Sequence, residues 1–363
     1  MNGAMSMRRV LLGAVCATAV VLSGMIAPPA RAAVFGVDDR GAVPVRHKAL
    51  SRSIGLFFNP KARTVCSAFC VGDNVIATAS HCIFKTAGEA PLDPADFRFG
   101  PPNANPAHLA RVAGSTTGTA ANNVIAGNMR LNVKPPIDAT QDWALVRLDR
   151  PVCRGAVLPV VPIPAPEVAA RARSGQVFHV AFHRDRLPWR LLYAPGCRIA
   201  PAFDQIDREQ IERDFRTPDR LLLHRCGTGG ASSGSPLLVE GPNGPVVVGI
   251  NVGTYVQSRV VLQDGSVLFR SKPEAIANTA VNATAFADAI ATFTARPAVQ
   301  SLVNRSNRAT SSADNGSSVS GTAASARLLR HNSQPASASS STGVPHSSAV
   351  ERATGGRSST NVP

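Results

Sequence analysis

Beyond its first 32 residues, the sequence lacks any apolar run long enough to span a bilayer. In the first 32, Arg8 and Arg9 precede an apolar run from Val10 to Ala27, and the segment Ala30-Arg31-Ala32 follows. A basic start, an apolar centre and a small-x-small ending are typical of a secretory signal peptide. An uncleaved membrane anchor is the alternative interpretation. Because of the Ala-x-Ala ending we expect cleavage, a soluble mature chain and a secreted or periplasmic localisation.

The sequence also lacks nucleic-acid-binding motifs and basic runs interleaved with aromatic residues, so we expect no nucleic-acid partner. Its formal net charge is +15, and this falls to +12 once the three arginines of the signal peptide are removed. A charge of this size can attract anionic surfaces or polymers. A solvated, arginine-rich surface is the simpler explanation.

Tryptophan, tyrosine and phenylalanine are missing from residues 300–363, which are rich in Ser, Ala and Thr. Such a segment cannot bury enough apolar surface to offset its chain entropy, so we predict a disordered tail. The tail could contact a cell wall or be processed, but we expect it to be dispensable for chemistry. The predicted organisation is a signal peptide at 1–32, one globular domain at 33–299 and a tail at 300–363.

Seven cysteines are present, and six remain once Cys16 leaves with the signal peptide. An even number in an exported protein predicts disulfides rather than reactive thiols. Cys66 and Cys82 flank the strand that leads to His81, so we predict that they pair. Cys197 and Cys226 bracket an insertion and could form a second disulfide, which would leave Cys70 and Cys153 for each other. The pairing of these last four stays open.

Short β-rich runs separated by Gly, Pro, Asn and Asp fill the region between residues 33 and 297. This pattern of short runs and turn residues predicts an all-β barrel or sandwich rather than alternating strands and helices. The predicted strands are Ser53–Phe58, Cys70–Ala77, Trp143–Leu148, Val177–Phe182, Arg220–His224, Ser235–Val239 and Pro245–Val252.

Two segments have helical character instead. Asp204–Phe215 places Ile206 and Ile211 among charged residues, which predicts a surface helix within an insertion. Asn282–Phe293 opens on a potential N-cap and spaces its large apolar residues four and then three apart. This spacing predicts an amphipathic helix that docks on the β-structure.

Three short motifs carry the chemistry. Thr78-Ala-Ser-His81-Cys82 supplies a histidine, Asp142-Trp-Ala-Leu-Val-Arg-Leu148 supplies an acid, and Ala231-Ser232-Ser233-Gly234-Ser235-Pro236 supplies serines. A base, an acid that orients the base, and a hydroxyl are the groups needed to make a serine nucleophilic. The chain is therefore predicted to be a serine hydrolase.

These motifs resemble those of chymotrypsin-like (trypsin-like) serine proteases, in particular the bacterial, V8-like branch. Cys66 and Cys82 lie sixteen residues apart, as in the disulfide around that family's catalytic histidine. Ser233-Gly234-Ser235-Pro236 is similar to the family's nucleophile loop, and Val248–Gly253 to one wall of its primary specificity pocket. The resemblance implies two six-stranded antiparallel β-barrels, the chymotrypsin-like double barrel, with a C-terminal helix. It also implies a secreted endopeptidase that acts on protein or peptide substrates, without metal or organic cofactor.

The resemblance implies a role for each site residue. Ser233 would attack the scissile carbonyl, His81 would accept its proton, and Asp142 would orient and stabilise the imidazolium. The backbone N–H groups of Ala231 and Ser233 would form the oxyanion hole.

Three departures from the family pattern bear on these roles. Ala231 stands where the family has glycine, and a φ value that glycine accepts would strain alanine. Ser232 offers an alternative register, Gly230-Ala231-Ser232, although this loses the following glycine and misplaces the proline. Ser232 also replaces the acid that ordinary trypsins use to bind a newly cut N-terminus, so we expect no such activation switch.

Four further residues are implied to form the primary specificity pocket: Gly227, Thr228, Asn251 and Gly253. Gly227 stands where trypsins carry an aspartate, so the resemblance does not predict a preference for basic residues. Thr228 resembles the threonine of V8-like glutamyl enzymes, but Asn251 replaces their accompanying histidine. We expect a small or medium apolar side chain at the cleavage site, with Gly253 leaving the pocket open.

Two other interpretations remain. An α/β-hydrolase would need a Gly-x-Ser-x-Gly elbow between a strand and a helix, with the catalytic histidine last in the chain, whereas His81 here precedes the serines. A catalytically weak or inactive homologue could instead act as a basic binding module. His179 and His183 are four residues apart on a predicted strand, but no carboxylate or cysteine completes a metal set there, so we expect surface or packing roles for them.

Overall fold

The computed structural model describes residues 33–203, 206–261 and 267–296. The predicted signal peptide and tail lie outside the described residues. All described residues belong to one compact unit. The predicted domain boundaries at 33 and 299 stay a prediction.

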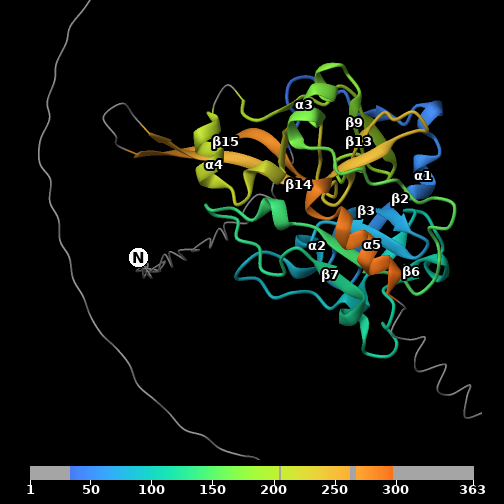
Figure 1. The fold of residues 1–363 in the computed structure, drawn as a ribbon. Helices are drawn as coiled ribbons and strands as arrows, with labels where there is room; N and C mark the ends of the chain where they lie inside the picture. Colours follow the sequence, from blue (N-terminus) through green and yellow to red (C-terminus); the bar gives the residue numbers. More distant parts are fainter. Residues whose placement is uncertain (1–32, 204–205, 262–266, 297–363) are drawn as a thin grey trace, which may run out of the picture. The chain divides into compact units, whose positions relative to one another are not determined.

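The described strands form two antiparallel sheets (Figure 1). The first has seven strands in the order β6 (Ala110–Arg111), β5 (Arg98–Gly100), β2 (Ile54–Asn59), β3 (Thr64–Gly72), β4 (Val75–Thr78), β8 (Ala144–Arg147) and β7 (Val124–Ala126). The second has eight in the order β1 (Gly41–Ala42), β10 (Leu191–Ala194), β9 (Val177–Phe182), β13 (Pro236–Val239), β14 (Val246–Val261), β15 (Val267–Asn282), β12 (Leu221–His224) and β11 (Ile199–Ala200).

This architecture confirms the predicted all-β, chymotrypsin-like arrangement of two β-structures. The sheets contain eight and seven strands rather than six each. The second sheet gains two-residue edge strands, β1 from the N-terminal segment and β11 from the insertion that precedes β12.

One predicted strand, Cys70–Ala77, is wrong. The segment is a hairpin in which β3 ends at Gly72 and β4 begins at Val75, with Phe69 paired to Ala77. Asp73 and Asn74 form the turn, because both side chains favour turn conformations over a continuous strand. The hairpin lets the chain reverse before it reaches His81.

The two sheets pack on each other through a shared core. Phe69 and Leu145 of the first sheet, and Phe178, Leu238 and Ile250 of the second, belong to one buried cluster. Fully burying an apolar side chain of this size stabilises the fold by roughly 1.5–3 kcal/mol. The segments that carry the chemistry lie where the sheets meet, so this packing sets their relative positions.

Five helices are described: α1 (Leu50–Ser53), α2 (His81–Phe84), α3 (Ala165–Arg173), α4 (Arg208–Asp214) and α5 (Ala287–Ala295). The two predicted helices are present but shorter. Helix α4 begins only after its N-cap Asp207, and α5 begins only at Ala287. Asn282 caps a 3₁₀ turn at Ala283–Ala285 rather than α5 itself. None of the described helices is long and apolar enough to cross a membrane.

The C-terminal helix α5 docks on the first sheet. Phe286 and Phe293 are buried, and the guanidinium of Arg147 from β8 lies 4.8 Å from the Phe293 ring centroid and donates to the Phe293 carbonyl. The spacing of the apolar residues therefore predicted the docking face of this helix correctly.

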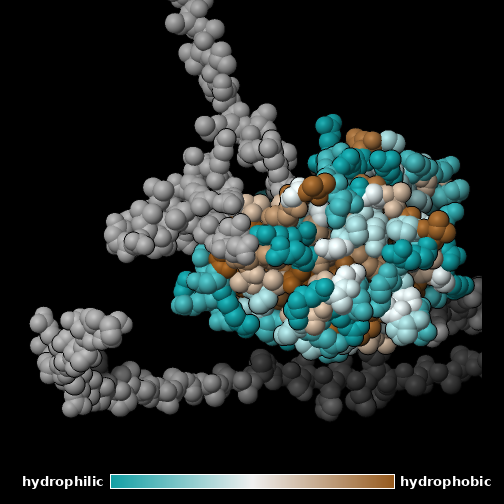
Figure 2. All heavy atoms as spheres, turned by 90° about the horizontal axis from the view of Figure 1, so that it is seen from above, coloured by the Kyte–Doolittle hydropathy of each residue, from teal (hydrophilic) through white to brown (hydrophobic). Residues whose placement is uncertain are grey.

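Three disulfides link the six described cysteines: Cys66–Cys82, Cys70–Cys153 and Cys197–Cys226. The predicted first pair is confirmed, and the structure selects the pairing of the other four that the sequence left open. Figure 2 shows hydrophobic residues as separate patches on a mostly hydrophilic face of the described region.

Candidate active site

His81 and Asp142 come together although they lie 61 residues apart in the sequence. His81 opens α2, directly after β4, and Asp142 precedes β8, which pairs with β4. The register Thr78–Ala144 therefore places the start of α2 beside the residue before Trp143. The Nδ1 atom of His81 lies 2.6 Å from Oδ2 of Asp142.

The carboxylate of Asp142 is held by two further donors. Its Oδ1 accepts from the backbone N–H of His81 at 2.9 Å and from the Ser80 hydroxyl at 3.1 Å. Asp142 is 7% exposed, so these bonds form in a largely dry environment. The carboxylate has a fixed orientation and selects the His81 tautomer that carries a proton on Nδ1.

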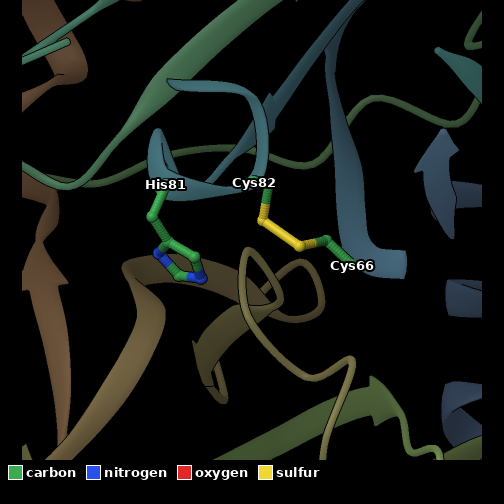
Figure 3. A group of neighbouring side chains, drawn as sticks. All are labelled: Cys66, His81 and Cys82. Carbon is green, nitrogen blue, oxygen red and sulfur yellow. A yellow bond between two sulfur atoms is a disulfide. The ribbon is translucent and has the colours of Figure 1, made fainter. Parts of the chain in front are cut away.

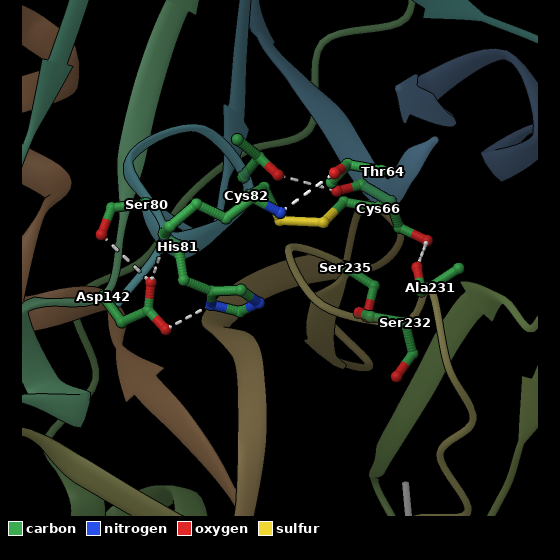
Figure 4. Close-up of a disulfide and its surroundings, with 12 residues drawn as sticks. Thr64, Cys66, Ser80, His81, Cys82, Asp142, Ala231, Ser232 and Ser235 are labelled. Atoms are coloured by element: carbon green, nitrogen blue, oxygen red, sulfur yellow. Dashed lines mark hydrogen bonds and ion pairs between the residues drawn. A yellow bond between two sulfur atoms is a disulfide. The ribbon is translucent and has the colours of Figure 1, made fainter. Parts of the chain in front are cut away.

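The electrostatic environment favours a protonated His81. Burial lowers the pKa of His81, but the charge and hydrogen bond of Asp142 raise it, and the net shift is upward. The side chain is 26% exposed, and the ring side opposite Asp142 faces the loop that carries Ala231, Ser232 and Ser235 (Figure 4). A base placed there can exchange a proton with a group on this loop.

The three serine hydroxyls of this loop differ in exposure and in hydrogen bonding. Ser232 is 2% exposed, and its Oγ accepts from Nδ2 of Asn251 at 3.1 Å. Ser235 is fully buried, and its Oγ donates to the Ser232 carbonyl at 2.6 Å. Ser233 is partly exposed, and its hydroxyl forms no hydrogen bond with any described residue.

The position of Gly234 can be occupied only by glycine. Its φ is +83°, and a Cβ atom there would lie 2.2 Å from Oγ1 of Thr78 and 2.3 Å from the carbonyl oxygen of Ser67. No residue with a side chain fits such contacts. The glycine lets the serine loop approach β3 and β4 of the first sheet closely.

Two backbone donors on this loop have no partner within the described part of the chain: the N–H groups of Ala231 and Ser233. The N–H of the residue between them, Ser232, donates to the Gly229 carbonyl at 3.0 Å. Unpaired N–H groups are rare in buried backbone and commonly mark a site where a ligand supplies the acceptor.

The orientation of each free N–H is fixed through its own peptide group, in which the carbonyl points the opposite way. The Ser232 carbonyl, which shares a peptide with the Ser233 N–H, accepts from the Ser235 hydroxyl and from Asn251 Nδ2. The Gly230 carbonyl, which shares a peptide with the Ala231 N–H, accepts from the Arg184 N–H at 2.6 Å. Both donors are therefore preorganised.

Ser67 of β3 ties the same loop to the first sheet. Its hydroxyl donates to the Ala231 carbonyl at 2.9 Å, and its N–H donates to the Ser233 carbonyl at 2.9 Å. Ala231 itself has φ = +77°, the left-handed region that disfavours side chains. The sequence-based expectation that alanine is strained at this position agrees with this value.

The predicted pocket residues separate into two groups. Gly253 lines a cleft of about 790 Å³ that also includes His81 and Asp142. Thr228 is buried and donates through Oγ1 to the Ala33 carbonyl at 3.4 Å, while Gly227 packs against the Arg40 side chain. Asn251 lies beneath the serine loop. Apolar residues such as Leu131, Ile137, Phe215, Val252 and Tyr255 line the cleft together with polar ones such as Lys134, Asp138 and Gln210.

Cys66, His81 and Cys82 place potential metal-binding atoms within 4.8 Å of one another. Both sulfur atoms are joined in the Cys66–Cys82 disulfide, so neither can act as a thiolate ligand (Figure 3). The cluster positions the start of α2 and has no donor set suited to a metal.

Sequence reasoning missed two parts of this region. Buried His179 bonds to the Ser235 hydroxyl at 2.6 Å, and buried His224 bonds to Asn251 Oδ1 at 3.1 Å. Arg40, in the N-terminal segment, reaches the loop after β9. His179 and His183 were predicted to have surface or packing roles, and both are buried. No local pattern connects His224 to the site.

Two facing β-structures with a histidine–aspartate pair opposite a serine loop define the class of chymotrypsin-like serine proteases. Residues 66–250, about half of the chain, match the family model described as trypsin-like peptidase domain. The chain belongs to this family. A search of curated protein sequences found no match.

Solved structures that resemble the chain include a Glu endopeptidase in complex with MPD, at 16% sequence identity and a TM-score of 0.46. That likeness covers 73% of this chain and all of the other. A thermostable serine protease, AL20, from an extremophilic microorganism is similar at 16% identity and a TM-score of 0.42, over 68% of this chain and all of the other. Neither likeness bears on substrate preference.

Proposed function

We propose that this protein is a secreted serine endopeptidase that cleaves peptide bonds through an acyl-enzyme. His81, Asp142 and Ser233 form its catalytic triad, and the N–H groups of Ala231 and Ser233 form its oxyanion hole. The observation that carries the proposal is the 2.6 Å contact between His81 Nδ1 and Asp142, with the other side of the ring facing the serine loop.

In the proposed reaction, His81 removes the hydroxyl proton of Ser233 as this oxygen attacks the scissile carbonyl. Asp142 stabilises the resulting imidazolium and keeps its own negative charge. The two preorganised N–H groups bind the carbonyl oxygen as its charge develops. His81 then protonates the leaving amine, and water hydrolyses the acyl-enzyme by the same steps.

The choice of Ser233 over Ser232 is supported by burial and bonding. Ser232 is 2% exposed, and its hydroxyl already accepts a hydrogen bond from Asn251. A nucleophile must reach both its base and the substrate, and a buried, bonded hydroxyl can do neither without rearrangement of the loop.

The substrate class follows from the cleft beside His81. The pairing of β13 with β14 ends at Ile250, and the next residues of β14, Val252 to Val256, line this cleft. An extended peptide can add to an open strand edge of this kind. The apolar lining supports acceptance of apolar side chains, and three disulfides support an oxidising, extracytoplasmic compartment.

The test is fluorophosphonate labelling of the purified protein, with casein hydrolysis in parallel. We expect both to be lost in Ser233→Ala and His81→Ala and retained in Ser232→Ala. Loss confined to Ser232→Ala would move the nucleophile by one residue. A folded wild type that neither labels nor cleaves casein would contradict the proposal and favour a binding module.

A further inference from the structure

Arg40 is a buried cation that the proposed mechanism does not use. Its side chain is only 2% exposed, although it belongs to the N-terminal segment and lies far in sequence from the serine loop. Buried guanidinium groups are rare unless they are fully paired. The partners of Arg40 therefore indicate what it holds together.

Two carboxylates bind Arg40 bidentately. Nε and Nη2 donate to the two oxygens of Asp38, each at 2.8 Å. Nη1 and Nη2 donate to the two oxygens of Asp185 at 3.1 and 2.7 Å. Hydrogen bonds from Arg40 lower the pKa of both carboxyls, so both are ionised at neutral pH.

The pair formed by Arg40 and Asp185 lies directly beneath the glycine-rich segment that leads into the serine loop. A Cβ atom at Gly229 would lie 2.4 Å from Oδ1 of Asp185 and 2.7 Å from Nη1 of Arg40. At Gly227 it would lie 2.9 Å from Cγ of Arg40. The backbone from Gly227 to Gly229 therefore rests on the ion pair.

Asp185 also fixes the segment that orients the Ala231 N–H. Its neighbour Arg184 donates its backbone N–H to the Gly230 carbonyl at 2.6 Å. This carbonyl and the Ala231 N–H belong to one peptide group and point in opposite directions. A shift of the loop at Arg184 would therefore rotate the Ala231 N–H.

The residue before Ser233 explains why the loop needs an anchor elsewhere. Ser232 carries no charge and bonds to Asn251, so it cannot form an ion pair with a cation. The N-terminal segment instead contributes a permanent internal cation. It is also attached at Ala33, whose carbonyl accepts from Asn278 Nδ2 at 3.1 Å.

We propose that Arg40 and Asp185 are positioning residues: their buried ion pair holds residues 183–186 and 227–230 so that the Ala231 N–H points to the reacting carbonyl oxygen. The inference rests on the proposed protease function and adds to it a structural requirement for the segment that carries Asp38 and Arg40.

The test uses the full chain and the variants Asp185→Ala and Arg40→Lys. Asp185 is 51% exposed, so its removal leaves Arg40 paired with Asp38 and should not prevent folding. The matched control is Asp73→Ala, which removes an exposed carboxylate in the β3–β4 turn, 3.5 Å from Arg154.

We expect kcat per titrated active site to fall by about 10- to 100-fold in Asp185→Ala and in Arg40→Lys, with KM changed by no more than about threefold. Misplacing one oxyanion donor has effects of this order. A peptide boronate, which binds the same donors, should lose affinity in parallel. Asp73→Ala should match the wild type in all three measurements.

A merely structural role would lower the number of titratable sites and leave kcat per site and boronate affinity unchanged, and that result would overturn the proposal. Hydrogen exchange of peptides that cover residues 227–235 gives a readout independent of catalysis. We expect faster exchange there in Asp185→Ala, and unchanged exchange would also contradict the proposal. An inert, well-folded wild type would instead contradict the protease function, while exchange would still report whether the ion pair orders the segment.

Discussion

Ala231 has a backbone conformation that is unusual for a residue with a side chain. Its φ of +77° would suit glycine, and its methyl group must be accommodated in the left-handed region. Hydrogen bonds to the Ala231 and Gly230 carbonyls hold this conformation. Strained residues of this kind persist only where their surroundings determine the backbone.

The substitution Ala231→Gly should relieve this strain. We expect the free energy of unfolding to rise by about 0.5–1 kcal/mol, because the relief exceeds the added entropy of the unfolded chain. The rate constant kcat should stay within about threefold, since the donor is a backbone group. Chemical denaturation and kinetics on one preparation measure both. A tenfold loss of kcat would show that the methyl group helps to position the N–H.

The His81–Asp142 pair predicts the acid limit of activity. The raised pKa of His81 means that the ring stays protonated, and unable to act as a base, up to a pH above its ordinary 6.5. The ratio kcat/KM should therefore fall with decreasing pH through a midpoint above 6.5. In Asp142→Asn this midpoint should move down, and kcat should drop by roughly 10⁴-fold.

Asp219→Asn serves as the control for this profile, because Asp219 is an exposed carboxylate that does not line the cleft. Its profile should coincide with that of the wild type. An acid midpoint at or below 6.5 in the wild type would show that Asp142 does not control the ionisation of His81.

At the residue scale, the contact between His81 and Asp142 could be predicted because each residue lies in a short local motif. Their triad with Ser233 stays a prediction. The supporting residues could not be predicted, since their roles arise from contacts across the chain. Arg40 and Asp185 are separated by 145 residues, and no local pattern links one to the other. Asn251 was predicted as a pocket residue, but its bonds to Ser232 and His224 appear only when β12 and β14 are brought together.

At the scale of elements, β9 and β12 place three buried histidines beneath the serine loop. His179 and His183 come from β9 and its end, and His224 ends β12. Since Nδ2 of Asn251 donates to Ser232, its Oδ1 must accept, so His224 carries a proton on Nε2. Burial lowers the pKa of His224 to about 4, and burial together with the Arg40 charge lowers that of His183 to about 4.

These buried histidines predict that the free energy of unfolding falls at acidic pH. The unfolded chain binds protons on them below pH 6.5, whereas the folded chain excludes them down to about pH 4. Their stabilising contribution is therefore complete above pH 6.5 and is lost as the pH falls toward 4. At pH 5 the loss should be roughly 2 kcal/mol for each of His183 and His224. Urea unfolding at pH 7, 6 and 5 measures it.

His183→Leu should reduce this pH dependence by about the contribution of one histidine. The substitution breaks no hydrogen bond, because neither ring nitrogen of His183 has a partner among the described residues. His108→Gln, at an exposed position, should leave it unchanged. Equal slopes in wild type and His183→Leu would place the acid-sensitive groups elsewhere.

Strands and helices were predicted correctly where a local sequence pattern identifies them. They were missed where the pairing of strands determines them. The strand Val177–Phe182 and the docking face of α5 follow from apolar runs and spacing. The break at Asp73 and Asn74 was missed because the flanking residues are continuously apolar. A strand was predicted at Pro245–Val252, but the continuation of β14 to Val261 and the whole of β15 were missed.

At the scale of the whole molecule, the disulfides constrain loops of very different length. Cys66–Cys82 closes 16 residues near His81, whereas Cys70–Cys153 closes 83 residues and joins β3 to the segment after β8. In the chain-entropy model, the longer loop restricts the unfolded chain more. The two should therefore contribute unequally to stability.

We expect the double substitution Cys70→Ala/Cys153→Ala to lower the free energy of unfolding by roughly 4–5 kcal/mol, and Cys66→Ala/Cys82→Ala by roughly 3 kcal/mol. Activity should show the reverse order, because Cys82 directly follows His81, whereas neither Cys70 nor Cys153 lines the cleft. Guanidinium unfolding followed by circular dichroism, together with kcat for each variant, measures both orders. A larger stability loss for the Cys66–Cys82 pair would mean that native packing around α2, rather than chain entropy, sets the contribution of that disulfide.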